Sequence, residues 1–417
     1  MNASAMPTTA GRGRDAVPAP RPDDRGTPMT HLLYVAGIFC LAAWFPASIQ
    51  IGALLIIVGS FGRLRRPVAI PWAVLIFIGW ALLSAAWSLL PQDTLDDVIK
   101  LLAVAVAGIF AANTVRPILL ARDAALALAI VCAASLVAAV VSPGTSFDTS
   151  GAMRGITPHG NSLGFNAALA VLCALFQIRR PDRRGAGWIA VVVLGGVALG
   201  FSTSMTALLG LVAGLAGAWM VWFVRTGPRE TAVYRAGGLL GALGAAGLLV
   251  LGNFDRLTLL IGRDPTFTGR TQIWSLILEL VSERPLTGYG VGAPWRAGSP
   301  IRADAEQTLG FEFVSAHNGL LDLVLEAGLM GLVVIIPLAV VAFVRYLTVP
   351  ELSRGLLWAL ALCFLFATAN MAEAYITSPF SWFLLCFLWA GPVASTPDPL
   401  IARRARVGRP SMISKES

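Results

Sequence analysis

The sequence predicts an all-α polytopic membrane protein with about twelve transmembrane helices and one large loop outside the membrane. Of its 417 residues, 56% are hydrophobic and 13% are charged, whereas a soluble domain has about 25% charged residues. Apolar runs long enough to cross a hydrocarbon core of about 30 Å recur along the whole chain. Most basic residues lie in the segments on one side of these apolar runs. This is the charge pattern of a membrane protein with a fixed orientation.

The chain begins with a polar tail, residues 1–31, which contains Pro, Arg and Asp. This tail is too long and too mixed in composition to be the basic region of a cleavable signal peptide. We therefore expect the tail to be cytoplasmic and the first apolar segment to be an uncleaved anchor.

Twelve apolar segments follow, nine within residues 32–252 and three within residues 317–393. Their approximate bounds are 32–45, 48–61, 69–89, 98–114, 121–141, 160–178, 187–202, 204–224, 235–252, 317–345, 355–372 and 376–393. The first two are short, so they form either a hairpin of two spans or one interrupted span. The long segment 317–345 contains Pro337, which predicts a kink or a tilt.

Lys and Arg indicate the orientation of these segments. With the N-terminus placed inside, 23 of the 31 Lys and Arg residues fall on the inner side and 8 on the outer side, while acidic residues show the opposite bias. Both termini are therefore predicted to be cytoplasmic. The basic C-terminal tail, residues 394–417, is expected to lie against anionic lipid. The high pI of about 9.8 then reflects topology, so no nucleic-acid partner is predicted.

Most of the outer basic residues lie in one polar loop, residues 253–316. They are Arg256, Arg263, Arg270, Arg284, Arg296 and Arg302. Basic residues are unfavoured on the outer side of a membrane, and guanidinium groups match phosphate oxygens in a bidentate manner. The loop is therefore predicted to bind an anionic ligand.

Residues 269–283 of this loop have an amphipathic pattern that predicts a short helix, with Thr268 as the N-cap and Pro285 after its end. The free N–H groups of its first turn, beside Arg270, predict a phosphate-binding site. Three glycines within residues 285–292 allow a tight backbone. A dinucleotide-binding fingerprint is the alternative interpretation of these glycines, but no strand–turn–helix unit surrounds them.

Histidines are the candidates for proton transfer, and the chain has three. His31 opens the first span on the inner side and is interpreted as an interfacial residue. His159 and His317 lie at outer helix mouths, and each is followed closely by an asparagine, Asn161 or Asn318. A single histidine near a helix end is usually an interfacial group, but two on one side near arginines favour general acid–base chemistry.

Charged residues near these two histidines complete the candidate set. Arg154 enters the sixth span beside the first histidine, although a plain loop-to-helix junction gives the same pattern. Asp322 and Glu326 follow the second by five and nine residues. They orient the histidine, pair with loop arginines, or lie in a solvated helical turn. Glu373 and Tyr375 are placed at the same mouth. The five cysteines lie in apolar spans without a CxxC spacing, so we interpret them as packing residues.

Four motifs occur in order after the stretch Leu83-Ser84-Ala85-Ala86-Trp87-Ser88…Pro91, and with it they span most of residues 80–335. They are Arg154-Gly155…His159-x-Asn161…Gly164, Thr268-Gly269-Arg270-Thr271-x-Ile273-Trp274, Glu283-Arg284-Pro285-Leu286-x-Gly288-Tyr289-Gly290, and Ala316-His317-Asn318-Gly319…Glu326-Ala327-Gly328-Leu329-x-Gly331-Leu332. The set resembles the O-antigen ligase and exopolysaccharide polymerase superfamily. One departure is His159-Gly160-Asn161, where the polymerase-like branch has His-Lys-Asn, and this removes a cation.

The resemblance implies a GT-C-like membrane glycosyltransferase of the bacterial inner membrane, with loop 253–316 in the periplasm. Such enzymes take glycan from an undecaprenyl-pyrophosphate donor without a nucleotide sugar, metal or cofactor. The resemblance implies that His317 acts on the acceptor hydroxyl, and the loop chemistry assigns Arg270 to the pyrophosphate. The remaining candidates are assigned to binding of pyrophosphate and glycan, namely Arg154, His159, Asn161, Arg284, Asn318 and Glu326.

The pattern Arg-Gly-x-x-x-His-x-Asn favours a polymerase that joins lipid-linked repeat units into exopolysaccharide or O-antigen. An O-antigen ligase that passes glycan to lipid A-core is the close alternative, because the two reactions share a donor; protein O-glycosylation is a third variant. A transporter or flippase would have charged residues along a path through the spans, and these are scarce. The expected partners are the lipid-linked donor, a glycan or lipid A-core acceptor, the bilayer and other polysaccharide export components.

Overall fold

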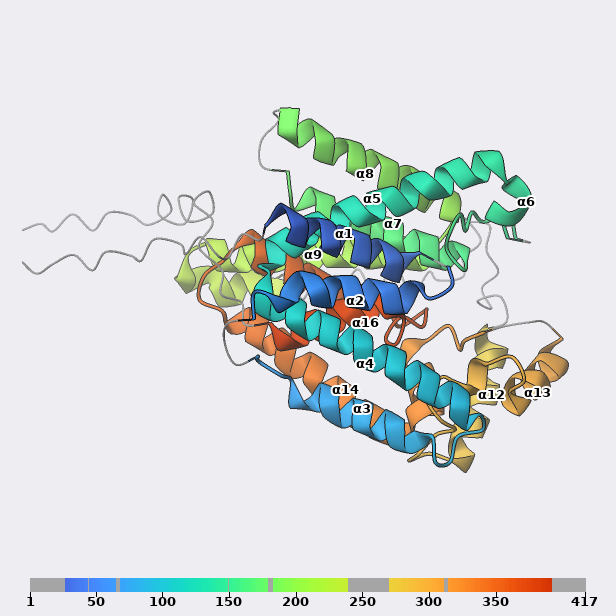
Figure 1. Cartoon of the computed structure of the whole chain (residues 1–417). Helices are drawn as coiled ribbons and strands as arrows, with labels where there is room; N and C mark the ends of the chain where they lie inside the picture. Colours follow the sequence, from blue (N-terminus) through green and yellow to red (C-terminus); the bar gives the residue numbers. More distant parts are fainter. Residues whose placement is uncertain are drawn as a thin grey trace, which may run out of the picture.

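The predicted all-α class is confirmed for the part of the chain that can be described. The computed structural model describes residues 27–43, 45–64, 68–148, 150–178, 183–238, 270–310 and 314–391. Within these ranges the named elements are all helices, and the one extended pairing is a bridge between Phe147 and Met153. Figure 1 shows the helices as a bundle.

Most of the predicted apolar segments correspond to a helix. These helices are α1 (Pro28–Ala42), α2 (Ser48–Phe61), α3 (Trp72–Ser84), α4 (Pro91–Thr114), α5 (Pro117–Val141), α7 (Gly160–Leu175), α8 (Arg183–Ser202), α9 (Met205–Thr226), α14 (Gly319–Thr348), α15 (Arg354–Ala369) and α16 (Pro379–Ala390). The segment 235–252 lies mostly outside the described residues. The first two segments are separate helices, α1 and α2, which pack against each other.

Length and composition support an integral membrane protein. Four helices are long and apolar enough to cross a membrane, namely α5, α9, α14 and residues Gly185–Ser202 of α8. Six shorter helices are also apolar. Helices such as α3 and α14 expose large apolar side chains, for example Trp72 and Val333. Extended apolar surface of this kind is typical of a protein surrounded by lipid.

The last two helices lie in the interior of the bundle. In α16, every side chain from Phe380 to Ala390 is buried. This helix packs against α4, while α15 packs against α9 and α5. The loop between α15 and α16, residues 370–378, is therefore held firmly at both of its ends.

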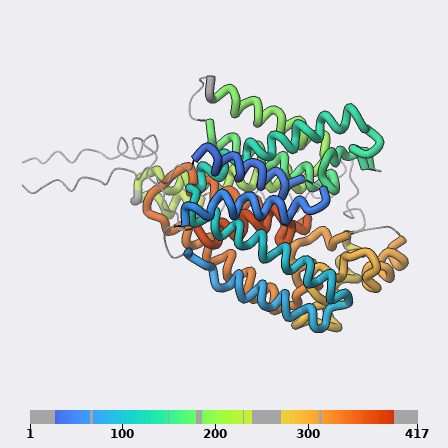
Figure 2. Tube along the Cα trace, in the orientation of Figure 1, coloured from blue at the N-terminus to red at the C-terminus, as the bar shows by residue number. Residues whose placement is uncertain are grey.

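The long connections lie together at one end of the bundle (Figures 1 and 2). Two helices of the polar loop, α12 (Arg270–Glu283) and α13 (Pro300–Leu309), lie beyond the bundle there. They are joined through a single 3₁₀ turn, Ala293–Trp295. The turns from α3 to α4 and from α15 to α16, together with the short helix α6 (Pro143–Ser146), lie at the same end. We call this end the loop face.

Helix α14 is broken at Gly328, where φ is 68° and ψ is −174°. The sequence predicted a kink in this segment from Pro337, but no residue near Pro337 leaves the helical conformation. The break is at Gly328 because the glycine-containing segment 285–290 supplies partners for the freed backbone groups. These bonds are Tyr289 N to Leu325 O (2.9 Å), Gly290 N to Glu326 O (3.0 Å) and Leu329 N to Pro285 O (2.8 Å). The break therefore locks the polar loop onto the membrane helix.

Replacing Gly328 with Ala is expected to destabilise the protein. A Cβ at this position would lie 2.1 Å from the Leu286 carbonyl oxygen, and the positive φ adds about 1–3 kcal/mol of strain. The control is Gly79→Ala in α3, where a Cβ meets nothing within 4 Å. The measurement is the thermal unfolding midpoint in detergent. Equal midpoints for the two variants would contradict this account of the break.

Candidate functional site

A cavity of about 1050 Å³ opens at the loop face. It lies where the α1–α2 loop, the start of α7, the start of α12 and the α15–α16 loop meet. Its polar lining consists chiefly of Lys100, His159, Asn161, Arg270, Arg302, His317 and Glu373. Its apolar lining includes Leu41, Phe45, Ile49 and Phe380. A ligand with a charged head and an apolar part matches a cavity with two such walls.

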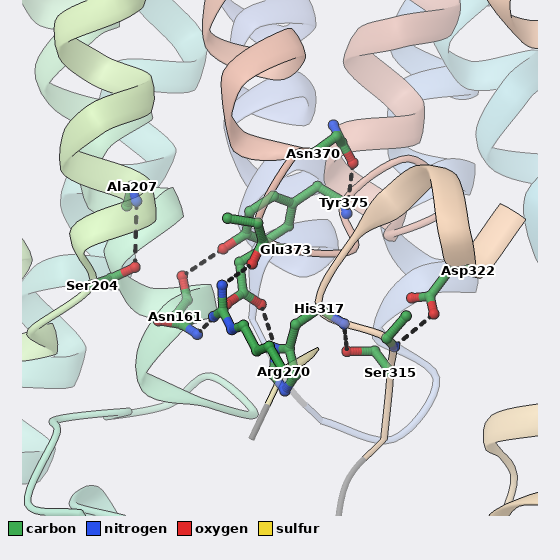
Figure 3. Close-up of polar contacts among 12 residues, drawn as sticks. Asn161, Ser204, Ala207, Arg270, Ser315, His317, Asp322, Asn370, Glu373 and Tyr375 are labelled. Atoms are coloured by element: carbon green, nitrogen blue, oxygen red, sulfur yellow. Dashed lines mark hydrogen bonds and ion pairs between the residues drawn. The ribbon is translucent and has the colours of Figure 1, made fainter. Parts of the chain in front are cut away.

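Glu373 is the centre of the polar wall (Figure 3). Its Oε1 atom accepts hydrogen bonds from Arg270 Nη2 at 2.7 Å and from Asn161 Nδ2 at 2.6 Å. Its Oε2 atom lies 3.0 Å from His317 Nδ1. The residue is buried, with 5% relative exposure. Three side chains from three other segments of the chain therefore meet at one carboxylate.

Arg270 is held by the fold on both sides of its guanidinium. Arg270 is the first described residue of α12, which corresponds to the predicted helix 269–283. The proposed N-cap, Thr268, lies outside the described residues. The helix is fixed by the buried Ile273 and by Trp274, whose Nε1 donates to Ala316 O at 2.8 Å. Besides Glu373, the guanidinium donates from Nη1 to Ala372 O at 2.7 Å.

His317 has an unusual backbone conformation. Its φ of 50° lies in the left-handed region that few residues other than glycine adopt. The neighbours hold it there: Asn318 caps α14 through bonds from Leu320 N and Leu321 N, at 3.0 and 3.1 Å. The Asp322 carboxylate accepts a bond from Ala316 N at 2.7 Å. Strained residues of this kind cluster at functional sites, so the conformation is an independent indication of function.

The loop that contains Glu373 is itself tied to the neighbouring helices. Asn370 Oδ1 accepts from Tyr375 N at 3.0 Å, and Asn370 O accepts from Gly319 N at 2.9 Å. The Tyr375 hydroxyl donates to Asn161 O at 3.0 Å, and its ring stacks on Phe165 with centroids 3.9 Å apart. The position of the carboxylate is therefore determined by α7, α14 and α15 together.

His159 faces the same cavity from the residue before α7. Burial lowers the pKa of its imidazole, and the nearby charge of His317 lowers this pKa further. At neutral pH the ring is therefore neutral and can both donate and accept one hydrogen bond. Such a group suits the hydroxyl groups of a sugar.

Two predicted arginines lie apart from Glu373. Arg154 does not line the cavity, and its Nε donates to Thr145 O at 2.8 Å. The Arg284 guanidinium covers the Tyr289 ring at 4.9 Å from the ring centre. Because Arg284 follows the last residue of α12, about 20 Å of helix separates it from Arg270.

Two further predicted residues support the backbone near the site. Asn318 caps α14 and also donates to Met371 O at 3.2 Å. Glu326 is buried beside the helix break, with its carbonyl bonded to Gly290, and it does not line the cavity. The position of Glu326 therefore does not support the interpretation of this residue as a direct substrate contact.

Glu373, which the sequence placed at this mouth, lines the cavity, but its bonds to three side chains were not predicted. Lys100 and Arg302 also line the cavity and had been given no individual role in the site. Glu373 lies 56 residues from His317 and 103 residues from Arg270, and no local motif links them. Its acidic character beside the last outward helix was the available signal. Within the described ranges, no three His, Cys, Asp or Glu side chains are arranged to hold a metal ion.

Comparison with known proteins gives two matches. A family model described as O-antigen ligase matches residues 190–336, a range that contains Arg270 and His317 but neither His159 nor Glu373. The chain is also 27% identical over 286 residues to the exopolysaccharide production protein ExoQ of Rhizobium meliloti (strain 1021). That match covers 65% of this chain and 64% of the relative's length, so it extends over slightly less than two thirds of the relative.

The two matches agree with the four sequence motifs, which lie largely in the same part of the chain. Together they confirm the resemblance that the motifs predict: this chain is similar to proteins of the O-antigen ligase and exopolysaccharide polymerase superfamily.

Proposed function

We propose that the chain is a glycosyltransferase that polymerises oligosaccharide repeat units linked to undecaprenyl pyrophosphate. The observation that supports this most is the group of Arg270, Glu373 and His317 on the wall of a cavity with an apolar side. In this proposal the protein has a GT-C-like architecture with twelve spans in the bacterial inner membrane. Both termini are cytoplasmic, and the loop face is periplasmic.

The transfer reaction requires two contributions from the protein. The acceptor hydroxyl oxygen forms a bond to the anomeric carbon of the donor, while the bond from that carbon to the pyrophosphate oxygen breaks. The hydroxyl proton moves to His317, and the lipid pyrophosphate leaves with the bonding electrons. Arg270 stabilises the negative charge on this leaving group, as preorganised cations do in other transfer reactions. His159 and Asn161 contact sugar hydroxyls beside the reacting bond.

The proposed topology predicts which residues react with a membrane-impermeant thiol reagent. Gln307→Cys on α13 should react in intact spheroplasts, whereas Glu351→Cys between α14 and α15 should react only after the membrane is permeabilised. Both positions are exposed, while Ser299 in the same loop is fully buried and unsuitable. The native cysteines other than Cys363 are buried, which keeps the background low. The reverse pattern would remove the periplasmic assignment of the site.

The polymerase proposal can be separated from the ligase alternative in cells. The name of the relative from Rhizobium meliloti, an exopolysaccharide production protein, favours polymerisation, and the family description favours a ligase. Deletion of a polymerase should leave single repeat units on the lipid carrier. Deletion of a ligase should instead leave full-length polymer on the carrier. Analysis of the lipid-linked glycans of a deletion strain therefore distinguishes the two.

A further inference from the structure

The Glu373 carboxylate is an unexpected neighbour for a pyrophosphate-binding arginine. It pairs with Arg270 at 2.7 Å, and its negative charge would repel a pyrophosphate bound to the same guanidinium. A site built only to bind the donor would be stronger without this carboxylate. Its buried position, with three side-chain hydrogen-bond partners, therefore requires a function other than donor affinity.

The geometry of His317 indicates that function. Among the bonds of the described residues, Glu373 Oε2 is the partner of the His317 ring, at Nδ1. A carboxylate oxygen accepts hydrogen bonds only, so Nδ1 carries a hydrogen, and in the neutral ring Nε2 then has the lone pair. The His317 side chain is 30% exposed and lines the cavity. Nε2 is thereby left as the basic atom of the ring.

We propose that Glu373 is a positioning residue that fixes His317 with Nε2 as the base and couples this base to the donor through Arg270. The inference rests on the proposed function. In the structure, Glu373 shares its charge between Arg270 and His317. When a donor pyrophosphate contacts Arg270, this cation is shared with the phosphate, and more of the Glu373 charge is available to His317. The base is therefore strongest when the donor is bound.

During transfer, the acceptor proton moves to His317 Nε2 and the ring becomes an imidazolium. Glu373 stabilises that cation through the Nδ1 hydrogen bond and remains ionised. The pyrophosphate leaves on the Arg270 side of the same carboxylate. One buried side chain therefore serves the base and the leaving-group cation together. Glu373 is assigned no role as the base itself, because it is buried and its oxygens face three protein donors.

The test is Glu373→Gln in purified protein reconstituted in nanodiscs. Turnover is expected to fall by roughly 10²–10⁴-fold, because a glutamine can present its NH₂ group to Nδ1 and cannot balance an imidazolium. Affinity for undecaprenyl pyrophosphate, used as the binding probe, should be unchanged or higher, because a competitor for Arg270 has lost its charge. Glu373→Asp retains the charge at a greater distance from both partners, so it should retain more turnover than the glutamine variant.

The matched control is Glu279→Gln, which removes an exposed carboxylate from the same helix as Arg270 and should have normal turnover. Near-normal turnover of Glu373→Gln would overturn the proposal. So would a loss of probe affinity that accounts for the whole loss of turnover, because Glu373 would then serve only to hold Arg270. If Glu373→Gln unfolds, the aspartate variant decides by the same two measurements. Failure of the wild-type protein to consume the lipid-linked donor would instead remove the proposed function.

Discussion

Replacing His317 with Asn is expected to reduce glycan transfer by roughly 10²–10⁴-fold while leaving folding and membrane insertion intact. Asparagine is the best-matched replacement because it tolerates the left-handed backbone conformation that His317 adopts, with φ of 50°. It has no ring nitrogen to accept the hydroxyl proton. The variant therefore separates the chemistry of the ring from the strain of the backbone.

Turnover should be measured with purified lipid-linked donor and compared with His159→Asn. His159→Asn should lose less turnover than His317→Asn, because His159 is proposed to contact the glycan and not to accept the proton. Near-normal turnover of His317→Asn, together with a severe loss for His159→Asn, would transfer the role of base to His159. A lower unfolding midpoint for His317→Asn would instead return His317 to a structural role.

Replacing Arg270 with Ala is the second change with a large expected effect, a loss of about 10²–10³-fold in transfer. The variant removes the cation that stabilises the leaving pyrophosphate, and it also removes a partner of Glu373. Arg270→Lys should retain only part of the activity, because one ammonium group cannot reproduce the two bonds to Ala372 and Glu373 and still bind phosphate in a bidentate manner.

Arg302→Ala and Arg284→Ala are the comparison variants for Arg270. Arg302 lines the same cavity but is paired with Glu306 at 2.7 Å. Arg302→Ala should therefore reduce polymer formation less than Arg270→Ala does. Arg284 lies at the far end of α12 and should matter least to the chemical step. The measurement is the yield and chain length of polymer in cells that carry each variant. Unchanged polymer with Arg270→Ala would mean that the pyrophosphate binds elsewhere.

The sequence was sufficient to predict most of the described helices because apolar run length and turn residues are local properties of the chain. The predicted helix 269–283 ends at Glu283 as α12 does, since Pro285 determines this end; its predicted first residue lies outside the described residues. Likewise, Arg270, His317 and Asn161 were selected from their chemistry and side of the membrane, and the structure brings them to one carboxylate.

The remaining features depend on contacts between distant segments. The break in α14 was expected at Pro337, but Gly328 is where the segment 285–290 can bond the free backbone groups. The same packing explains why Glu326 is buried beside the break, away from the cavity. Glu373 could be placed near the mouth from sequence, but its bonds to three side chains depend on the packing of α15 and α16.

In the proposed function, this protein transfers glycan from a lipid-pyrophosphate donor to a second repeat unit at the loop face. The most direct measurement uses the wild-type protein in liposomes with a purified repeat unit on undecaprenyl pyrophosphate as the sole glycan. We predict a ladder of products that differ by whole repeat units, with release of undecaprenyl pyrophosphate, and no ladder with His317→Asn. A donor that remains unconsumed until lipid A-core is added would contradict the polymerase assignment, and equal ladders from both proteins would contradict the proposed site.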